Sequence, residues 1–282
     1  MTSAATSVSC VIVAFHRPDL LGALVSAIRH PQIELVVVNV EADPEISAIA
    51  GEAVVDVADN VGFAAAVNIG ARRATAAVIV FMNDDMRATH EEVLRLAEAV
   101  SRSDAHAAVP MVLRPGGDVE PTVRRLPGAW AHVTDPMFQR RWSPPRSTQQ
   151  IKAAGAAMVA VPTRLLRNEP MPEDYFLYYE EIEWFWRLRE RHVTVTYEPD
   201  VRVVHLGGYA EVRPDKTRLL ATNAVRCVRR TRGRSAAARA WPVVVAWNMA
   251  LLAATVVTPA RRSELQARRA GVSAALRAWR EI

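Results

Sequence analysis

The sequence predicts an α/β protein in which a mainly parallel sheet is flanked by helices and followed by a helical C-terminal extension. Strand-like and helix-like segments alternate from residue 8 onward, which is the pattern of consecutive βαβ units. The strands are short, continuous apolar runs, which is typical of buried strands. With 282 residues, 50% of them hydrophobic, the chain is long enough to bury one large core or two modest ones.

The expected elements follow one another without an internal repeat. Strands are expected at residues 8–15, 33–40, 54–57, 78–82, 107–113, 193–197 and 201–205, and helices at 19–29, 60–74, 91–100, 178–191 and through the remainder of the chain. Pro18 begins the first helix, in which Leu20, Leu21, Leu24 and Ile28 are expected to share one face. A tight loop is expected at 114–118 and an irregular segment between 121 and 147.

Charge is distributed unevenly along the chain. Residues 211–282 carry 15 Lys and Arg against 4 Asp and Glu, whereas residues 1–210 carry 20 against 26. A basic extension on an acidic body predicts a polyanionic partner for the extension: anionic lipid, lipid-linked diphosphate or nucleic acid. The two distant cysteines, Cys10 and Cys227, fit a reducing compartment, and no secretion signal is expected, so the predicted location is cytoplasmic.

The stretch that most strongly indicates a function is Asn83-Asp84-Asp85, at the end of the strand that begins at Val78. Ligands of open α/β sheets bind beyond the carboxyl ends of the strands. Two carboxylates at that edge could hold a hard divalent cation, and the cation could hold a diphosphate. A strand-to-helix turn with Asp85 near the N-cap of the helix from about Thr89 would explain the same residues.

A second stretch, Asn60–Gly70, combines a glycine, small residues and two amides. Gly62 permits a backbone conformation or a close approach that a side chain would forbid. Three alanines after it would let a helix pack closely on its neighbour, and Asn60 could cap that helix. A capped helix of small residues does not explain Asn68, whose polar side chain within the helix indicates a ligand or a hydrogen-bond network.

A third stretch places Glu180, Glu181 and Glu183 in one helical turn beside five aromatic residues. Acids in a first turn complement the helix dipole. Apolar surroundings, however, raise the pKa of a carboxyl group toward the range that is useful to a general base. Glu181 points away from the other two, so one acid could work while the others hold structure. His205 ends a later strand and precedes two glycines, and it is a candidate nitrogen ligand for the same metal.

With these stretches in this order, Val8 to Tyr209 resembles the inverting glycosyltransferases of family 2, in particular the bacterial rhamnosyltransferase-like branch. The most specific parts are Phe176–Arg187 with His205-Leu206-Gly207-Gly208, followed by the stretch from Asn60 to Gly70. The resemblance implies a GT-A type fold that binds a nucleotide-diphospho-sugar. It also implies a catalytic domain at 1–210, with a nucleotide-sugar half at about 1–115 and an acceptor and catalytic half at about 116–210, before the basic extension at 211–282.

The resemblance implies a role for each motif. Mg²⁺ or Mn²⁺, which grips the donor diphosphate in this family, would be bound by Asp85, Asp84 and His205, and the catalytic base would be Glu181. The implied donor-binding residues are Ala14, His16, Arg17, Asn39, Asn60, Gly62, Phe63, Asn68, Asn83 and Asp84. The implied acceptor-binding residues are Glu180, Glu183 and Gly155.

Several positions depart from the family pattern. Glu181 and Glu183 stand where the family usually has Asp, and each adds a methylene that would displace the carboxylate by about 1 Å; misplacement of that size can cost on the order of 10²-fold in rate. Asn39 replaces an Asp that commonly meets the nucleoside, although its oxygen could still accept from a uracil or thymine N–H. A catalytically weakened relative that binds a sugar nucleotide or a partner enzyme is therefore an alternative interpretation.

The expected activity is transfer of a sugar, with rhamnose as the best guess, from a dTDP- or UDP-linked donor to a hydroxyl of a glycan, lipid-linked or other acceptor. A dinucleotide-dependent enzyme is disfavoured because no Gly-x-Gly-x-x-Gly follows the strand at Val8–Phe15. A nucleotidyltransferase would need a glycine-rich loop there, where His16-Arg17-Pro18 stands. Only the basic extension suggests nucleic acid, and we expect no nucleic-acid partner.

The most apolar run of the chain, Trp241–Thr258, lies between arginine-rich segments. It is slightly short for a membrane-spanning helix, with Pro242 near its start and Asn248 inside it. Basic residues on both sides also fit poorly with spanning. We expect peripheral contact with the inner face of the cytoplasmic membrane. A buried helix that packs on the catalytic domain or on a second subunit of a homodimer is the alternative.

Overall fold

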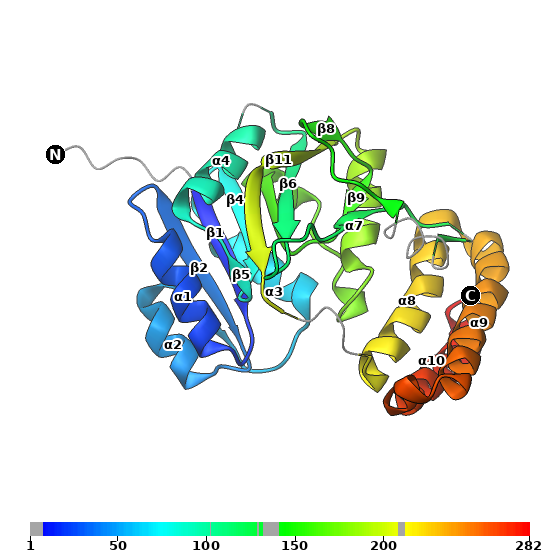
Figure 1. The fold of residues 1–282 in the computed structure, drawn as a ribbon. Coiled ribbons are helices and arrows are strands. Elements are labelled where there is room, and N and C mark those ends of the chain that lie inside the picture. The colour runs from blue at the N-terminus through cyan, green and yellow to red at the C-terminus, as the bar shows by residue number, and fades with distance from the viewer. Residues whose placement is uncertain (1–7, 102, 129, 132–140, 208–211) are drawn as a thin grey trace.

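The computed structural model describes residues 8–101, 103–128, 130–131, 141–207 and 212–282. Within them, a nine-stranded sheet lies at the centre of the protein, in the order β3-β2-β1-β4-β10-β6-β11-β5, with β8 paired to β11 (Figure 1). Its strands are β1 (Val8–Ala14), β2 (Ile33–Val40), β3 (Val54–Val57), β4 (Val78–Asn83), β5 (Met86–Arg87), β6 (His106–Leu113), β8 (Gln149–Gln150), β10 (Met158–Pro162) and β11 (Thr194–His205). A separate pair consists of β7 (Val123–Arg124) and β9 (Ala153–Ala154).

Parallel pairing builds the amino-terminal half of the sheet, as the alternation of strands and helices predicts. β1 pairs in parallel with β2 and β4, and β2 pairs in parallel with β3. β10 is antiparallel to β4 and β6, β11 is parallel to β6, and β5 and β8 are antiparallel to β11. The predicted α/β class with a mainly parallel sheet is therefore confirmed, and the antiparallel strands are β5, β8 and β10.

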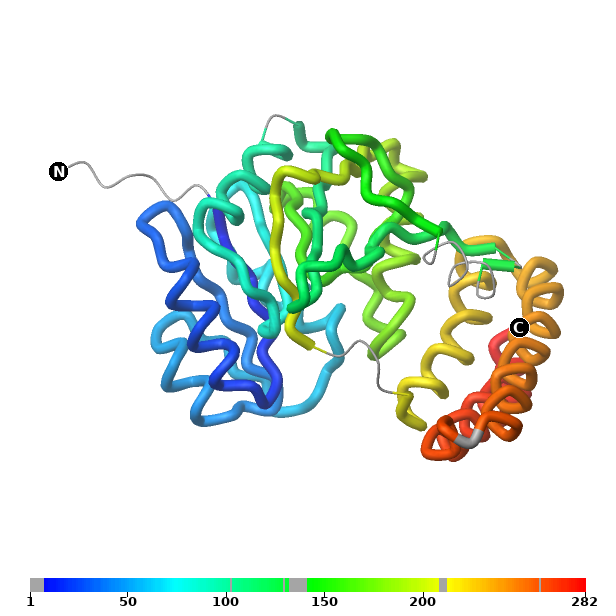
Figure 2. The backbone as a smooth tube through the Cα atoms, in the orientation of Figure 1, coloured from blue at the N-terminus to red at the C-terminus, as the bar shows by residue number. Residues whose placement is uncertain are grey.

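Helices cover both faces of this sheet, as Figures 1 and 2 show. They are α1 (Pro18–Ile28), α2 (Pro44–Ala50), α3 (Phe63–Arg73), α4 (His90–Val100), α6 (Thr163–Asn168) and α7 (Glu180–Glu190). Ile79 and Phe81 of β4 belong to the apolar core that includes α3 and α7, whereas Val80 and Met82 belong to the core that includes α1 and α4. Successive side chains of a strand point to opposite faces, so a strand between two helical layers must be apolar throughout.

A few predicted elements differ from those observed. The predicted strands 193–197 and 201–205 form one strand, β11, whose register shifts between Glu198 and Arg202. α3 begins at Phe63 rather than at residue 60, because Gly62 has a φ of +80° and ends the preceding loop. The 7-residue α2 and the 6-residue α6 were not predicted, since such short segments show little periodicity. Part of the predicted irregular segment, residue 129 and residues 132–140, lies outside the described residues.

The C-terminal region is helical, as predicted, and consists of α8 (Pro214–Arg232), α9 (Arg234–Val257) and α10 (Leu265–Arg277), with 3-10 turns at Pro259–Glu264 and Ala278–Glu281. The three helices pack together beside α7 and β9 (Figures 1 and 2). α9 has 24 residues and a mean hydropathy of 1.8 in its most apolar window, so by length and composition it could cross a membrane. Only 17% of that window is buried, and its other residues are half-buried or exposed.

Candidate active site

A cavity of about 580 Å³, referred to below as the cleft, opens where β1 and β4 end at one edge of the sheet. This edge is where ligands of open α/β sheets bind. The sequence-predicted residues that line it are Arg17, Asn60, Gly62, Phe63, Asn83, Asp84, Asp85, Gly155, Glu180, Glu181 and His205. The fold therefore brings together three polar stretches that lie far apart in the sequence.

The two carboxylates after β4 have different surroundings. Asp84 accepts a hydrogen bond of 2.8 Å from the backbone N–H of Phe15, which ties the ends of β1 and β4 together. Burial raises the pKa of Asp84 to about 6. Asp85 instead forms an ion pair with Arg17 and lies beside His205. Of the two, Asp85 presents its carboxylate to charged partners within the cleft.

His205 reaches Asp85 because β5 follows the two carboxylates and pairs with the end of β11, which sets Met86 opposite His205. Nε2 of His205 lies 3.2 Å from Oδ1 of Asp85, and its Nδ1 lies 3.2 Å from Oε2 of Glu120. Burial lowers the pKa of His205, but the hydrogen bonds to Asp85 and Glu120 outweigh it and raise the pKa to about 9. Burial likewise raises the pKa of Asp85, but His205 and Arg17 outweigh it and lower that pKa.

The same pair fits a divalent cation. Oδ1 of Asp85 is buried and, apart from its 3.2 Å contact with Nε2 of His205, has no hydrogen-bond partner among the described residues, so it remains a candidate ligand oxygen. A carboxylate and an imidazole suit Mn²⁺ or Mg²⁺, whose other positions are commonly filled by substrate phosphates and water. Among the described residues, no three His, Cys, Asp or Glu side chains are arranged to hold a metal by themselves. Asp85 and His205 would therefore share the ion with a bound phosphate ligand.

Gly62 lets the loop that precedes α7 lie directly against the start of α3. Its φ is +80°, and a Cβ atom on it would lie 2.3 Å from the carbonyl oxygen of Phe176. A residue with a side chain would be strained in this conformation and would clash with this carbonyl. The N–H of Phe63 donates to the same carbonyl at 3.1 Å. Asn60 accepts a hydrogen bond from the N–H of Gly62 at 3.2 Å, so it shapes the turn rather than capping α3 as predicted.

The loop that leads into α7 has an unusual backbone. Phe176, Tyr178 and Tyr179 all have positive φ, between +65° and +78°, which is costly for residues other than glycine. Asn223 of α8 stabilises this conformation: its side chain is buried, and its amide donates to three carbonyls of the loop at 3.2, 2.9 and 3.0 Å. A residue of the C-terminal region therefore holds the loop that positions Glu180 and the rest of the first turn of α7.

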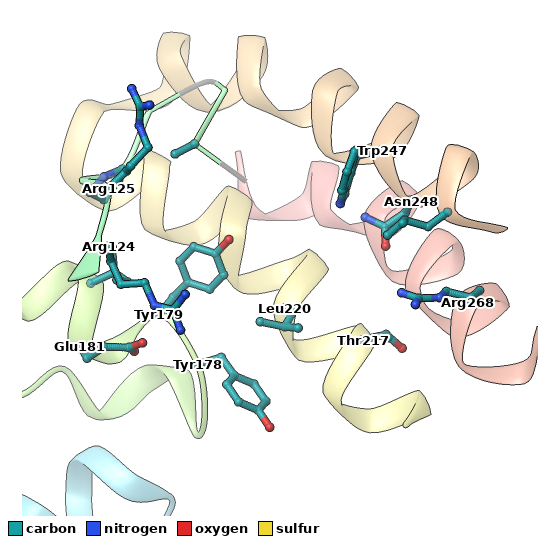
Figure 3. A pocket seen from close by; sticks show the side chains of 14 residues that line it. Arg124, Arg125, Tyr178, Tyr179, Glu181, Thr217, Leu220, Trp247, Asn248 and Arg268 are labelled. Carbon is teal, nitrogen blue, oxygen red and sulfur yellow. The ribbon is translucent and has the colours of Figure 1, made fainter. Parts of the chain in front are cut away.

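Glu180 and Glu181 begin α7 and line the wall of the cleft. Glu180 is 5% exposed, and its Oε2 has no hydrogen-bond partner among the described residues. Burial, followed by the charge of Glu181, raises the pKa of Glu180 well above its ordinary value. Glu181 also lines a second cavity of about 300 Å³ between α7 and the C-terminal helices, shown in Figure 3. Glu181 is thus the acid that both cavities share.

Glu183, predicted to bind the acceptor, does not line the cleft. It is 2% exposed, and its carboxylate pairs with Arg187 and with Arg230, whose Nε lies 2.8 Å from Oε2. The hydroxyl of Tyr175 donates to the same carboxylate. A buried charge is tolerated only when it is paired and hydrogen-bonded. Glu183 therefore joins α7 to α8, and the i+4 partnership with Arg187 is part of that junction.

Two asparagines predicted to bind the donor are instead buried in hydrogen-bond networks. The side-chain amide of Asn39 donates to Asp43, Ser47 and Asp56, and its oxygen accepts from the N–H of Asp43. Asn39 is fully buried, so it does not face a nucleobase in the cleft.

Asn68 exchanges hydrogen bonds with the backbone of Met171 at 2.8 and 3.0 Å and also donates to Glu173. The sequence left two explanations for Asn68, a ligand or a hydrogen-bond network, and the structure shows the hydrogen-bond network. Asn68 therefore fastens α3 to the segment before α7 and does not line the cleft.

Three further predictions need correction. Ala14 is fully buried, and His16 is exposed and pairs with Glu41 at 2.7 Å, so neither lines the cleft. Val13 of β1 and Phe15, just after the strand, line the cleft instead. Asp85 does not cap the following helix: Thr89 forms a capping box with Glu92 at the start of α4, after the short strand β5.

The structure also reveals functional candidates that the sequence analysis did not single out. Glu120 holds His205, Arg124 lines both cavities, and Asn223 holds the loop before α7. Glu120 and Arg124 come from a segment without strong periodicity, and Asn223 lies on a helix that looked like an independent extension. The significance of Glu120 and Asn223 depends on contacts with residues 45 or more positions away, which no local pattern indicates.

Residues 9–171 match the family model described as Glycosyl transferase family 2. No curated protein is significantly similar to the chain in sequence.

GalNAc-T7, solved with UDP, GalNAc and Mn²⁺, matches in structure with a TM-score of 0.59 and 16% sequence identity. The match covers 79% of this chain and 48% of GalNAc-T7, so this chain spans about half of that protein. The mannosyltransferase PcManGT from Pyrobaculum calidifontis, solved with GDP-Man and Mn²⁺, matches with a TM-score of 0.59 and 13% identity over 98% of this chain and 88% of its own. A mycobacterial protein matches with a TM-score of 0.56 and 16% identity, covering 82% and 76%.

At these identities the structural matches show the fold alone. The mixed sheet flanked by helices, with its helical C-terminal region, is a GT-A type fold, as the sequence predicted. The family model covers more than half of the chain, and its range includes the acidic stretch after β4 and the start of α3. The chain therefore belongs to glycosyl transferase family 2.

Proposed function

We propose that this glycosyltransferase is metal-dependent and inverting, and that it moves a sugar from a dTDP- or UDP-linked donor to a hydroxyl of a glycan, lipid-linked or other acceptor. The observation that carries the proposal is that Glu181 and the Asp85–His205 pair line one cleft at the carboxyl ends of β1 and β4. Sugar transfer needs a base for the acceptor and a site for the diphosphate. The structures of GalNAc-T7 with UDP and of PcManGT with GDP-Man, both with Mn²⁺, support a nucleotide-linked donor.

In the proposed reaction, the acceptor hydroxyl lies against the carboxylate of Glu181. The carboxylate takes the hydroxyl proton while the acceptor oxygen bonds to the anomeric carbon. The bond from that carbon to the diphosphate oxygen breaks on the opposite face, and its electron pair leaves with the nucleoside diphosphate, so the configuration inverts. Mn²⁺ or Mg²⁺ bound by Asp85 and His205 would supply Lewis acidity toward the diphosphate.

The remaining parts of the proposal rest on the sequence resemblance and on the lining of the cleft. The donor would occupy the half formed by residues 1–115, against Arg17, Asn60 and Gly62, and the acceptor the half formed by residues 116–210, near Gly155. Rhamnose as the sugar follows from the resemblance alone. We propose a cytoplasmic location with peripheral membrane contact through the basic extension, 211–282.

The test of this function is the variant Glu181→Gln. The amide keeps the shape of the side chain but cannot take a proton, so transfer should fall by at least about 10²-fold while donor affinity is kept. Transfer is measured with a panel of nucleotide sugars and acceptors, and donor binding is measured in parallel by the thermal shift in Mn²⁺. The matched control is Glu190→Gln, an exposed residue of the same helix, which should transfer like the wild type.

Undiminished transfer by Glu181→Gln would move the base to another acid. A wild-type protein that binds a donor but transfers its sugar to no acceptor, in conditions where another family member is active, would instead support the weakened relative. The Glu in place of the usual Asp motivates that second candidate.

A further inference from the structure

The second cavity has the position that an acceptor site needs. Arg124, Tyr178 and Glu181 line both this cavity and the cleft, so the two meet at Glu181. An inverting displacement requires the acceptor to approach from the side opposite the leaving diphosphate. The Asp85–His205 pair lines only the cleft, whereas α9 and α10 contribute only to the second cavity; α8 contributes to both.

All three C-terminal helices contribute to its walls. Figure 3 shows Glu181 and Arg124 at one end, Leu220 and Thr217 of α8 along one side, and Trp247 and Asn248 of α9 with Arg268 of α10 at the other end. The basic extension is therefore part of the site rather than a separate attachment.

The lining indicates the chemistry of the occupant. It contains three arginines, Arg124, Arg125 and Arg268, against the single acid Glu181. Arg268 also pairs with Glu264, outside the lining, at 2.7 Å, and the net charge of these groups still favours an anion. Guanidinium groups match phosphate oxygens in geometry as well as in charge. Much of the remaining wall is apolar or aromatic, including Trp247. An occupant that is anionic at one point and apolar elsewhere satisfies both features.

The size of the cavity and the surface beside it also indicate what kind of molecule would bind there. A volume of about 300 Å³ is at the lower end for ligand pockets, enough for a head group but not for a whole glycolipid. α9, which supplies Trp247 to the pocket, continues into an outward apolar surface where Met249, Val256 and Val257 are 55%, 56% and 78% exposed. A hydrocarbon chain leaving the pocket would find this surface next to it.

We propose that this second cavity is the acceptor site, and that it takes an amphiphilic acceptor whose phosphate or diphosphate lies among the arginines and whose hydrocarbon chain follows α9. The inference rests on the proposed function, since it places the acceptor hydroxyl against Glu181. It assigns acceptor recognition to the C-terminal helices, with Arg268 and Leu251 as residues that determine acceptor specificity.

The experiment uses the full chain and three probes: farnesyl diphosphate, inorganic diphosphate and farnesol. The two farnesyl compounds are kept below the concentrations at which they form micelles. Binding is measured by calorimetry with the cleft filled by UDP or dTDP and Mn²⁺. Farnesyl diphosphate should bind at least about tenfold more tightly than either of the other two probes. Arg268→Gln removes a cation and Leu251→Trp fills the pocket, and each should weaken farnesyl diphosphate binding by about tenfold. The matched control is Arg269→Gln, at an exposed neighbour, which should bind like the wild type.

Three results would overturn the inference. In the first, both pocket variants bind farnesyl diphosphate like the wild type. In the second, the nucleotide displaces farnesyl diphosphate, which would place farnesyl diphosphate in the cleft. Inorganic diphosphate could also bind as tightly as farnesyl diphosphate, which would make the acceptor a water-soluble anion. A wild type that binds neither UDP nor dTDP with Mn²⁺ would count against the proposed function itself. If nucleotide binds and the pocket variants change nothing, only the acceptor inference fails.

Discussion

The carboxyl group of Glu180 is almost completely buried at the wall of the cleft. Because burial and the charge of Glu181 raise its pKa above the ordinary 4.5, the folded protein holds this proton to a higher pH than the unfolded chain does. A folded state that binds more protons gains stability at low pH. This contribution is fully present below pH 4.5 and is lost as the pH rises through the pKa of the folded state.

Replacing Glu180 with Gln should therefore change stability in a pH-dependent manner. At pH 8 the variant should melt at a higher temperature than the wild type, because it no longer has to bury a charge or bind a proton. The difference should shrink toward pH 5, and thermal unfolding across this range measures it. Glu190→Gln, exposed on the same helix, should show no such trend. A constant difference between Glu180→Gln and wild type at all pH values would contradict the assignment.

In the proposed function, Asp85 is the residue on which donor binding through a metal would depend. Asp85→Asn keeps the shape of the side chain but removes its charge, so Mn²⁺-dependent binding of UDP or dTDP should weaken by at least about 100-fold. The thermal shift caused by nucleotide with Mn²⁺, compared with nucleotide in chelator, measures this. Asp19→Asn, at an exposed position of α1, is the control. A variant that still responds to Mn²⁺ as the wild type does would remove Asp85 from the metal site.

At the scale of elements, the loop between η2 (Glu173–Tyr175) and α7 depends on elements on both sides of it. Gly62 and Phe63 at the start of α3 contact the carbonyl of Phe176, and Asn223 of α8 holds the other carbonyls. The positive φ values of this loop persist because these contacts offset their cost. Contacts from both α3 and α8 therefore hold the loop that positions α7.

Asn223→Ala should loosen this loop without touching a substrate. Losing a buried donor to three carbonyls should cost about 1–3 kcal/mol in the free energy of unfolding. Transfer should fall more than nucleotide affinity, because a displaced α7 moves Glu181 away from the acceptor. Denaturant unfolding and the separate kcat and KM values measure both effects, with Thr222→Ala on the same helix as the control. Equal losses of stability in both variants, with unchanged kcat, would leave Asn223 without a positioning role.

At the scale of the whole molecule, the C-terminal helices are joined to α7 and to the loop before it by buried polar contacts. Arg230 of α8 pairs with the buried Glu183 of α7, and Asn223 bonds to the loop before it. Removing the extension would leave the buried carboxylate of Glu183 without Arg230, and a buried charge without its partner is strongly destabilising. Truncation near residue 208 is therefore expected to disturb the active site itself, and point substitutions on α9 are the better probe of membrane contact.

The outward face of α9 should bind anionic vesicles. Met249 and Val256 are more than half exposed, and arginines lie on both sides of the helix in the sequence. The protein should sediment with anionic vesicles at low salt and remain in solution at high salt, because salt screens the arginines. The double variant Met249→Glu/Val256→Glu should lose this binding, whereas Leu276→Glu on α10 should not. A protein that stays in the supernatant and forms a dimer which the double variant disrupts would make α9 a subunit interface.

The elements of the fold and the three polar stretches could be predicted because both are local properties. Apolar runs mark the predicted strands to within a residue or two, as at Ile33–Val40 and Val54–Val57. The strands β5, β7, β8, β9 and β10 were not predicted. The conformational role of Gly62 is also local, since only glycine adopts its φ at little cost. Asp85, Glu181 and His205 stand out because charged or titratable groups follow or flank apolar segments.

The tertiary structure alone decided which polar residues face the cleft and which are buried as structural partners. Asn68, Asn39 and Glu183 looked like ligand-binding residues, but each finds its partners within the protein, and Asn68 finds them more than 100 positions away. Glu120, Asn223 and the second cavity became visible only when β11, α8 and α9 were in place. The physical reason is that sequence spacing determines periodicity and backbone conformation, whereas burial, hydrogen-bond partners and the meeting of two cavities at Glu181 depend on contacts between distant segments.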